Sequence, residues 1–409
     1  MGEGLSLRDV ALSFGTPLYV YSKRSIVDHC RHIERAFEGH DHVTYYAVKA
    51  NSNRNILKII AQEGLGADVA SKGELHLALS AGFPPQKITF SGVGKRDDEI
   101  AYALASDIAA FNVESVEELE VINSIAGNAG RMARILLRVN LDIDPGGHAY
   151  VTTSLKHTKF GIDSRHALDV LKWAQGQQHF EVRGIHSHIG SQITKVDTFM
   201  TAARALGDLV KTLRSSGIQI DDLDFGGGFG VQYRGYVRHE KIPVEQPEEV
   251  NLSASTLVRN VLPLLKETGC RISIQPGRSI VAHAGVLLVR VLYRKETEGK
   301  VFVVVDGGMN DLIRPSLYQS HHQIVPLVVN GAATEIVDVV GPLCESGDFF
   351  ALNRCLPRVQ RGDYLGVMCT GAYGFVLSSN YNARLRPAEV LIDDATVTVI
   401  RERETVEDL

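Results

Sequence analysis

Eight apolar or β-branched runs alternate with amphipathic segments along the first two thirds of the chain, and this alternation most constrains the fold. The runs begin near Val43, Ala67, Lys87, Ala109, Arg134, Val182, Ile220 and Arg271. Most segments between them space their apolar residues as a helix does. Strands that alternate with helices indicate a parallel sheet, and eight such units over roughly 240 residues match a (β/α)8 TIM-type barrel. A doubly wound sheet alternates in the same way and is the lesser alternative.

The pattern changes from about residue 282 onward. Residues 286–291, 301–305, 334–340 and 396–400 resemble strands, with no long amphipathic segment between them. A further strand-like run, residues 17–22, precedes the barrel. We therefore predict three parts. Residues 1–30 pack with the β domain, residues 31–281 form the barrel, and residues 282–409 form a mostly-β domain, either a sandwich or a barrel.

Composition excludes several classes of protein. The 409 residues carry a formal net charge of −5, which argues against nucleic acid or an anionic membrane surface as a partner. No apolar run reaches the ~18 residues of a transmembrane helix, and the N-terminus does not resemble a secretory signal. The five cysteines are scattered, which is typical of a reducing compartment. We expect a cytoplasmic protein.

Lys49 follows the first predicted strand, and in a barrel the reactive side chains gather at the carboxyl ends of the strands. A lysine at this position is either one whose charged end reaches solvent or one whose amine forms a Schiff base. His186 and His188 share a face of the sixth strand. Such a pair can bind a metal, pack on a flat ligand or be part of the core, but no carboxylate or cysteine adjoins it. We expect no metal.

Glycine-rich segments follow the seventh and eighth strands, at Gly226, Gly227 and Gly228 and at Gly277. Consecutive glycines let backbone N–H groups approach an anion, although a flexible turn has the same composition. A phosphate site after these two strands is common in barrels. A Schiff-base lysine, a flat imidazole and a phosphate loop together fit pyridoxal 5′-phosphate, which has an aldehyde, a ring and a phosphate.

Essentially the whole chain resembles the barrel-type (fold type III) pyridoxal-phosphate decarboxylases, the family of ornithine, arginine and diaminopimelate decarboxylases. Residues 45–51, 188–192, 226–230 and 276–278 are similar to the cofactor motifs of that family. Residues 314–318, 344–348 and 371–375 make the chain most similar to the diaminopimelate decarboxylases.

The resemblance implies a role for each matching residue. Lys49 would carry the cofactor, and His188 would stack on its ring. The remaining cofactor-binding residues would be Ser191, Gly226, Gly227, Gly228, Gln275, Gly277 and Tyr373. The substrate-binding residues would be Arg278, Arg314, Tyr318, Glu345, Ser346 and Tyr373. Cys344 would stand near the reacting carbon, so that Lys49, His188 and Cys344 form the catalytic set.

The implied reaction is the decarboxylation of meso-2,6-diaminopimelate to L-lysine and CO2, the last step of lysine biosynthesis. Arg278, Arg314 and Tyr318 would bind the distal carboxylate and Glu345 the distal ammonium, which disfavours ornithine. The loop of Cys344 would reach into the partner's barrel, so a homodimer with shared sites is expected. A carboxynorspermidine-type decarboxylase, an amino-acid racemase and a pyridoxal-phosphate carrier are the alternatives.

Gln275 departs from the family pattern, in which a glutamate pairs with the protonated pyridine nitrogen. A neutral amide forms no such ion pair, so the ring loses part of its electron sink. Three interpretations are open: a decarboxylase with a weaker sink, a paralogue with altered chemistry, or a cofactor-binding protein with little turnover. We predict a decarboxylase, because the substrate-end residues are all present. The long loop that contains residues 144–150 is predicted to act as a lid.

Overall fold

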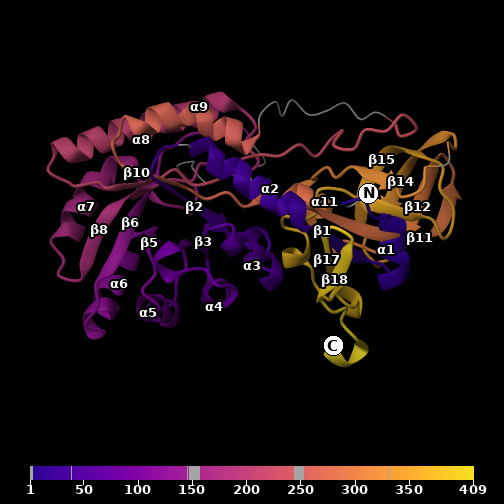
Figure 1. The fold of residues 1–409 in the computed structure, drawn as a ribbon, viewed down its shortest axis with the longest axis horizontal. Coiled ribbons are helices and arrows are strands. Elements are labelled where there is room, and N and C mark those ends of the chain that lie inside the picture. The colour runs from indigo at the N-terminus through magenta and orange to yellow at the C-terminus, as the bar shows by residue number, and fades with distance from the viewer. Residues whose placement is uncertain (1–2, 38, 145, 147–156, 244–252, 330) are drawn as a thin grey trace. The chain divides into compact units, whose positions relative to one another are not determined.

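The computed structural model describes residues 3–37, 39–144, 146, 157–243, 253–329 and 331–409 (Figure 1). The chain forms two compact units. The barrel unit comprises His29–Gly230 and Asn251–Ser279, and the β-rich unit comprises Met1–Asp28, Val231–Val250 and Ile280–Leu409. The domain boundaries at residues 30 and 281 stay our proposal.

Eight parallel strands close into a ring in the barrel unit, in the order β2-β3-β4-β5-β6-β8-β9-β10, with β10 paired to β2. Their bounds are β2 His42–Ala47, β3 Gly66–Val69, β4 Ile88–Phe90, β5 Ala110–Val113, β6 Ala133–Asn140, β8 Phe180–His186, β9 Asp222–Asp224 and β10 Arg271–Ile274. The short strand β7 (Ile162–Asp163) pairs with β6. The closed ring confirms the predicted (β/α)8 barrel and excludes the doubly wound sheet.

Helices follow the barrel strands and cover them on the outside (Figure 1). They are α3 Arg54–Gln62, α4 Lys72–Ala81, α5 Asp97–Ala105, α6 Val116–Asn128, α7 Ala167–Gln175, α8 Val196–Ser215, α9 Ala254–Lys266 and the single turn α10 Arg278–Val281. Side-chain oxygens of Asn53, Ser71, Ser115 and Ser253 accept from the first turns of α3, α4, α6 and α9. Such caps satisfy backbone N–H groups that a helix leaves unpaired. They end the loops at the carboxyl side of the barrel, where the predicted site residues lie.

The β-rich unit is built on one sheet in the order β15-β14-β12-β11-β1-β17-β18, with β16 paired to both β11 and β13. Its strands are β1 Leu18–Ser22, β11 Gly285–Thr297, β12 Lys300–Val305, β13 Ile324–Pro326, β14 Thr334–Val340, β15 Phe349–Pro357, β16 Tyr364–Val367, β17 Ala388–Asp393 and β18 Thr396–Arg401. Its helical segments are α1 Leu7–Phe14 and α11 Arg314–Tyr318, and α2 Lys23–Glu34 runs from this unit into the barrel unit.

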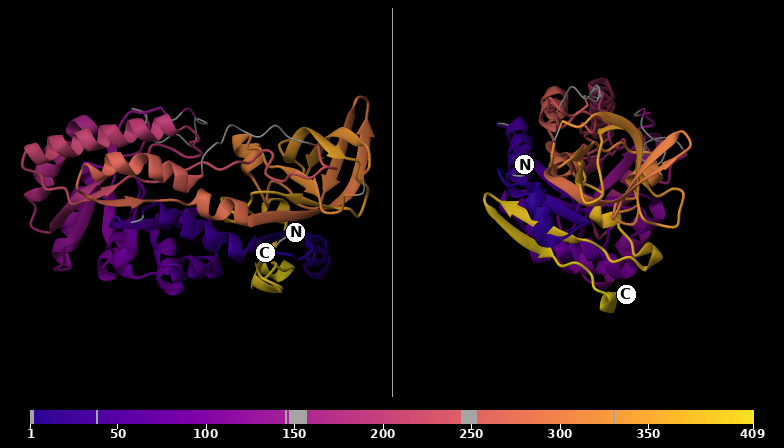
Figure 2. Two further views of the ribbon diagram at one scale, coloured as in Figure 1. Left: turned by 45° about the horizontal axis from the view of Figure 1, so that its top comes forward. Right: turned by 90° about the vertical axis from the view of Figure 1, so that its right-hand side faces the viewer.

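The N-terminal strand β1 lies inside this sheet, between β11 and β17 (Figure 2). It pairs antiparallel with β11 and parallel with β17. Leu18 and Val20 pack in one apolar cluster with Leu288 of β11 and Val390 of β17. Burial of these alternate side chains explains why the first strand of the chain joins its C-terminal domain. The predicted partnership of the N-terminal strand with the β domain is confirmed.

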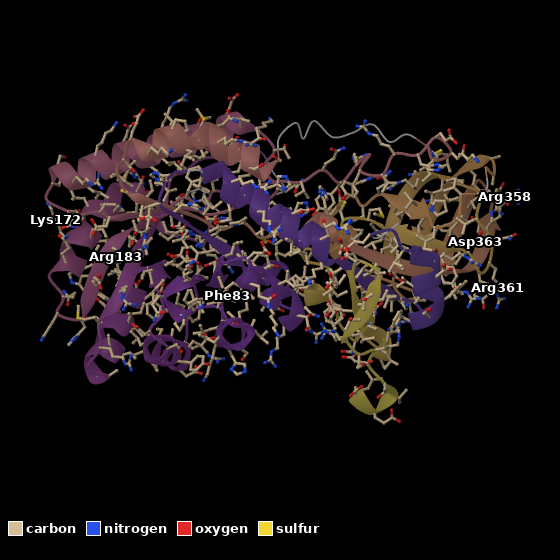
Figure 3. The ribbon with its side chains drawn as sticks, viewed as in Figure 1. Phe83, Lys172, Arg183, Arg358, Arg361 and Asp363 are labelled. Atoms are coloured by element: carbon tan, nitrogen blue, oxygen red, sulfur yellow. The ribbon has the colours of Figure 1, made fainter. Side chains whose placement is uncertain are left out.

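Exposed charged side chains such as Lys172 and Arg361 extend from the surfaces of the units (Figure 3). None of the helices in the described part of the chain has the length and apolar character needed to cross a membrane. Of the predicted lid at 144–150, residues 145 and 147–150 lie outside the described residues. The lid stays a prediction.

Candidate active site

The predicted site residues fall into two sets, one in each unit. The barrel unit holds Lys49, His188, Ser191, Gly226, Gly227, Gly228, Gln275, Gly277 and Arg278. The β-rich unit holds Arg314, Tyr318, Cys344, Glu345, Ser346 and Tyr373. Each set is described within its own unit.

Lys49 lies in the 3-10 turn Val48–Ala50, directly after β2. The N–H of Ala47 donates to the carbonyl of Pro276 at 3.0 Å, which ties this turn to the loop after β10. A Cβ on Gly277 would lie 3.0 Å from the Cβ of Ala50 and 3.1 Å from that of Ala47. Glycine at 277 therefore allows the lysine turn to pack directly on this loop.

The three glycines after β9 form a tight loop between the ends of β8 and β10. Gly226 and Gly228 have φ angles of +73° and +94°, which side-chain-bearing residues rarely adopt. A Cβ on Gly226 would lie 2.2 Å from the carbonyl oxygen of Ser187, and one on Gly227 would lie 2.0 Å from that of Gln275. The close approach of three backbone segments requires glycine here, so this run is more than a flexible turn.

His188 is held by this glycine loop. The N–H of Gly227 donates to its Nδ1 at 3.1 Å. Burial lowers the pKa of His188 well below its usual value, and the charge of Lys49 lowers it further. The ring is therefore neutral with its proton on Nε2, a state suited to packing on an aromatic ligand.

Ser191 and Arg278 meet on the same side of the barrel. The Nη2 of Arg278 donates to the Oγ of Ser191 at 2.8 Å, and the arginine is buried. The resemblance assigned Ser191 to the phosphate and Arg278 to the substrate carboxylate. Both roles stay predictions, and the contact brings the two side chains together.

Gln275 is the centre of a buried polar cluster at the ends of four strands. Its Nε2 donates to Asp224 at 3.0 Å and to Asp68 at 3.3 Å, and its Oε1 lies 3.2 Å from the Nε2 of His186. All four residues are buried. Burial raises the pKa of Asp224 to about 7 and also raises that of Asp68, and it lowers the pKa of His186 well below its usual value.

In the β-rich unit, Arg314 and Tyr373 lie close together. Arg314 begins α11 and is buried, with its guanidinium carbon 5.2 Å from the ring centre of Tyr233 and 6.0 Å from that of Tyr373. Its Nε donates to His322 at 3.2 Å. Tyr318, at the other end of α11, is half-buried. A buried guanidinium against aromatic rings is suited to planar recognition of a carboxylate.

The loop of Cys344, Glu345 and Ser346 is exposed. Its shape is set by the buried carboxylate of Asp348, which accepts from the N–H groups of Leu343 at 2.7 Å and of Met309 at 2.6 Å. A second tie runs from the hydroxyl of Ser316 in α11 to the carbonyl of Gly347 at 2.5 Å. The cysteine and glutamate are therefore presented at the surface by a loop anchored on α11.

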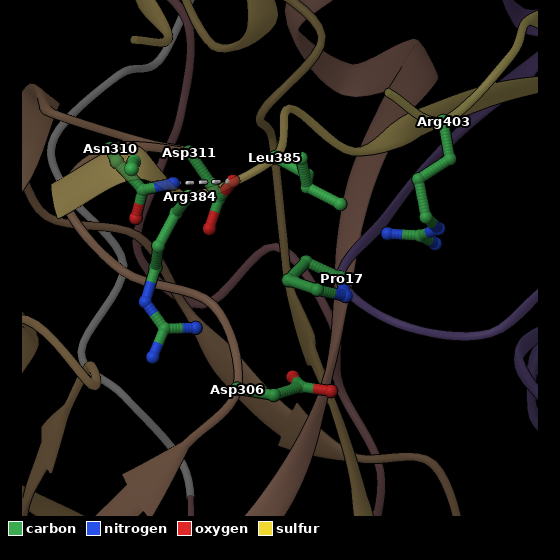
Figure 4. Close-up of a pocket in the computed structure, with 8 residues that line it drawn as sticks. Pro17, Asp306, Asn310, Asp311, Arg384, Leu385 and Arg403 are labelled. Carbon is green, nitrogen blue, oxygen red and sulfur yellow. Dashed lines mark hydrogen bonds between the residues drawn. The ribbon is translucent and has the colours of Figure 1, made fainter. Parts of the chain in front are cut away.

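A cavity of about 310 Å3 lies elsewhere in the β-rich unit (Figure 4). It is lined by Pro17, Asp306, Asn310, Asp311, Ala383, Arg384, Leu385 and Arg403. Its carboxylates already accept hydrogen bonds: Asp306 from Thr16 and the N–H of Arg290, and Asp311 from Asn310 and the N–H of Gly308. None of the predicted site residues lines this cavity. We therefore give its polar groups a structural role in the β-rich unit.

Comparisons with known proteins identify the family of this chain. Residues 23–282 match the family model described as "Pyridoxal-dependent decarboxylase, pyridoxal binding domain". A diaminopimelate decarboxylase of Pseudomonas aeruginosa is 46% identical over 407 residues, 100% of this chain and 95% of that protein. One of Aquifex aeolicus is 44% identical over 402 residues, 98% of this chain and 92% of that protein. The chain belongs to the diaminopimelate decarboxylase family.

Solved structures of the diaminopimelate decarboxylase family have the same fold. The Helicobacter pylori enzyme in complex with L-lysine is 38% identical, with a TM-score of 0.90 and 98% coverage of both chains. A lysine/ornithine decarboxylase of Vibrio vulnificus, 23% identical with a TM-score of 0.79, shares the fold. The predicted membership of this family is confirmed.

The barrel unit has the polar groups that pyridoxal phosphate requires. The Nδ1 of His186 and the hydroxyls of Ser187 and Ser279 are buried, and none has a hydrogen-bond partner within the described residues. His186 ends β8 and Ser187 follows it beside the glycine loop, and Ser279 lies in α10, which follows β10. Buried polar atoms without a protein partner fit a site that is completed by a polar ligand. The residues present therefore fit the cofactor of the family.

Sequence reasoning missed Asp68 and Asp224 as members of the site. Both stand at or next to the carboxyl end of a barrel strand, β3 and β9. That position was the available signal, because reactive side chains gather there. The two carboxylates meet at Gln275, which is 207 residues from Asp68 in the chain.

Proposed function

We propose that this protein decarboxylates meso-2,6-diaminopimelate to L-lysine and CO2 with pyridoxal 5′-phosphate as cofactor, the last step of lysine biosynthesis. The observation that carries the proposal is identity of 40–46% over nearly the whole chain with proteins named diaminopimelate decarboxylase. The buried arginine Arg314 supports it, because a substrate with a second carboxylate needs such a partner.

The cofactor supplies an electron sink for the electron pair that remains when CO2 leaves. Lys49 would hold it through the lysine amine, and the neutral ring of His188 would pack on its ring. By the resemblance, Ser191, the glycine loop, Gly277 and Tyr373 would hold its phosphate, with backbone N–H groups as donors. Gln275 would pair with its ring nitrogen.

Recognition of the substrate depends on its distal end. By the resemblance, Arg278, Arg314 and Tyr318 would bind the distal carboxylate and Glu345 the distal ammonium, with Ser346 as a further substrate-binding residue. A buried guanidinium that loses the charge-assisted hydrogen bonds of a carboxylate keeps the cost of its burial without that compensation, so a substrate with a bare amine at that end is disfavoured. This selection favours diaminopimelate over ornithine and lysine.

Two groups are candidates for returning a proton to the reacting carbon. The exposed thiol of Cys344 is one, and the amine of Lys49 is the other. His188 contributes no proton in this account, because burial holds its pKa well below neutral.

We also propose a cytoplasmic homodimer with shared active sites. The exposed loop of Cys344, Glu345 and Ser346 supports sharing, because a solvent-facing loop takes part in a desolvated site when a second subunit covers it. All five cysteines are free thiols, which supports a reducing compartment.

Steady-state CO2 release tests the function. The holoprotein is assayed with meso-diaminopimelate, L-ornithine, L-lysine and carboxynorspermidine at equal concentrations. We expect diaminopimelate to give the highest kcat/KM. Faster turnover of carboxynorspermidine would assign the chain to that related activity, and faster turnover of ornithine would contradict the proposed role of the arginines.

A further inference from the structure

The side chain of Gln275 has few hydrogen-bonding positions left for a ligand. A primary amide has two N–H donors and an oxygen with two lone pairs. Both donors are used, because Nε2 contacts Asp224 at 3.0 Å and Asp68 at 3.3 Å. One lone pair of Oε1 is used by His186 at 3.2 Å. One acceptor position remains.

Chemistry determines which way round this amide stands. Rotating the amide by 180° would place Oε1 against two carboxylate oxygens. The oxygens would repel one another, and the carboxylates would lose the N–H groups that now donate to them. The rotated Nε2 would then face His186. A neutral imidazole donates or accepts at Nε2 according to its tautomer, so His186 is compatible with the present orientation, in which its Nε2–H donates to Oε1. The two carboxylates therefore decide the orientation.

The two carboxylates have separate anchors that keep them in place. Asp224 accepts from the N–H of Gly226 at 2.8 Å, so it is tied to the glycine loop. Asp68 accepts from the hydroxyls of Ser91 at 2.5 Å and Thr89 at 3.3 Å. The orientation of Gln275 thus depends on neighbours that are themselves bound to the barrel.

We infer that Gln275, although neutral, presents only its amide oxygen, a hydrogen-bond acceptor, to the cofactor ring and therefore selects the protonated form of the ring nitrogen. Asp224 is the positioning residue that holds the amide in this orientation. The inference rests on the proposed function, in which Gln275 lies at that nitrogen. An amide that is free to turn could also bind the unprotonated nitrogen, because it could donate an N–H to it. In its ionised form Asp224 removes that choice, because both it and Asp68 accept from Nε2.

Nitrogen NMR of the bound cofactor tests this inference. The apoprotein is reconstituted with pyridoxal phosphate carrying ¹⁵N in the ring, and the chemical shift is read above the pKa of Asp224, which is about 7, so that this carboxyl is ionised. The shift reports whether the ring nitrogen is protonated. We expect a protonated nitrogen in the wild type and in Gln275→Glu. In Asp224→Asn the new amide can donate to Oε1, so Gln275 can turn and the signal moves toward the unprotonated position. An unprotonated wild-type nitrogen, or an unchanged signal in Asp224→Asn, would overturn the inference.

Three further variants separate positioning from general damage. Thr89→Val removes a donor to Asp68 without touching Gln275 and is expected to keep the wild-type signal. Gln275→Leu removes the acceptor and is expected to give an unprotonated nitrogen even if Asp224→Asn folds poorly. The double variant Asp224→Asn/Gln275→Glu is expected to restore the protonated signal, because a carboxylate has no donor to turn toward the ring. Failure of that rescue would contradict the positioning role.

The measurement is made without substrate. A protein that shows the expected spectra but releases no CO2 from diaminopimelate would contradict the proposed function and leave the inference about Gln275 standing. A protein that releases CO2 from diaminopimelate but has an unprotonated ring nitrogen would support the proposed function and contradict the inference about Gln275. The two failures are therefore distinguishable.

Discussion

The N–H of Gly227 donates to the Nδ1 of His188 at 3.1 Å, so the glycine loop sets the tautomer of the histidine predicted to stack on the cofactor. One short segment thus serves two ends of the ligand. Its backbone lies where the phosphate is proposed to bind, and the same backbone orients His188, whose ring is proposed to stack on the cofactor. Changes to this loop are expected to act on cofactor affinity before they act on chemistry.

Gly226→Ala is expected to weaken cofactor binding by roughly tenfold or more, since positive-φ strain of about 1 kcal/mol adds to a steric clash. The new Cβ would lie 2.2 Å from the carbonyl oxygen of Ser187. Equilibrium dialysis with pyridoxal phosphate measures the change in Kd. Gly217→Ala is the matched control, because Gly217 has a φ of +85° but nothing within 4 Å of its Cβ position. An equal loss of affinity in both variants would show that the loss does not come from the clash inside the glycine loop.

Asp224 is expected to make stability fall as the pH rises toward neutrality. Burial raises its pKa to about 7, against about 4 in the unfolded chain. Between these values the folded protein holds a proton that the unfolded chain has released, so the free energy of unfolding decreases with rising pH. Asp224→Asn removes this titration, so the unfolding free energy falls less steeply with pH. The slope changes by the amount that corresponds to at most one proton released on unfolding. Urea unfolding between about pH 5 and pH 7 measures the slope.

The neighbouring Asp221 provides the control for this measurement, because its side chain is exposed. Asp221→Asn is expected to keep the wild-type dependence of unfolding free energy on pH. If Asp221→Asn and Asp224→Asn change the slope equally, the assignment of the titration to the buried carboxyl is wrong.

Arg314→Lys is expected to lower kcat/KM for diaminopimelate by about 100-fold, because a lysine cannot reproduce a bidentate contact with a carboxylate and truncated buried charge pairs cost several kcal/mol. The absorption of the bound cofactor should be unchanged. Arg290→Lys, at an exposed arginine of the same unit, serves as the control. Wild-type kinetics in Arg314→Lys would exclude Arg314 from substrate recognition.

Mixing two inactive variants tests whether sites are shared between subunits. Lys49→Ala and Cys344→Ala, each inactive or strongly impaired alone, are co-refolded or co-expressed. If the loop of Cys344 completes the partner's barrel, one site of each mixed dimer contains both native residues and part of the activity returns. Mixtures no more active than their components would contradict shared sites.

The fold was largely predictable because strands buried on both faces are continuous apolar runs. Predicted starts near Val43, Ala67 and Arg271 lie within one residue of the observed β2, β3 and β10. The strand predicted at 286–291 is longer, since β11 continues to Thr297 as a hairpin arm with β12. Its exposed outer half has polar residues that the apolar pattern could not include.

The site was predictable where residues form local motifs and not where the barrel brings distant residues together. The glycine loop and Lys49 are each recognisable in one short segment. Asp68 and Asp224 are single carboxylates in ordinary strands, and their contact with Gln275 depends on the closure of the barrel. The orientation of that amide, and hence the meaning of a glutamine at position 275, is a property of the packed cluster.

Release of CO2 from meso-diaminopimelate by the holoprotein tests the central claim most directly. We predict that the wild type forms CO2 and L-lysine in equal amounts, that Lys49→Ala forms neither and lacks the absorption of lysine-bound cofactor, and that Gln275→Glu remains active. Absence of CO2 from both the wild type and Gln275→Glu would contradict the assignment as a diaminopimelate decarboxylase.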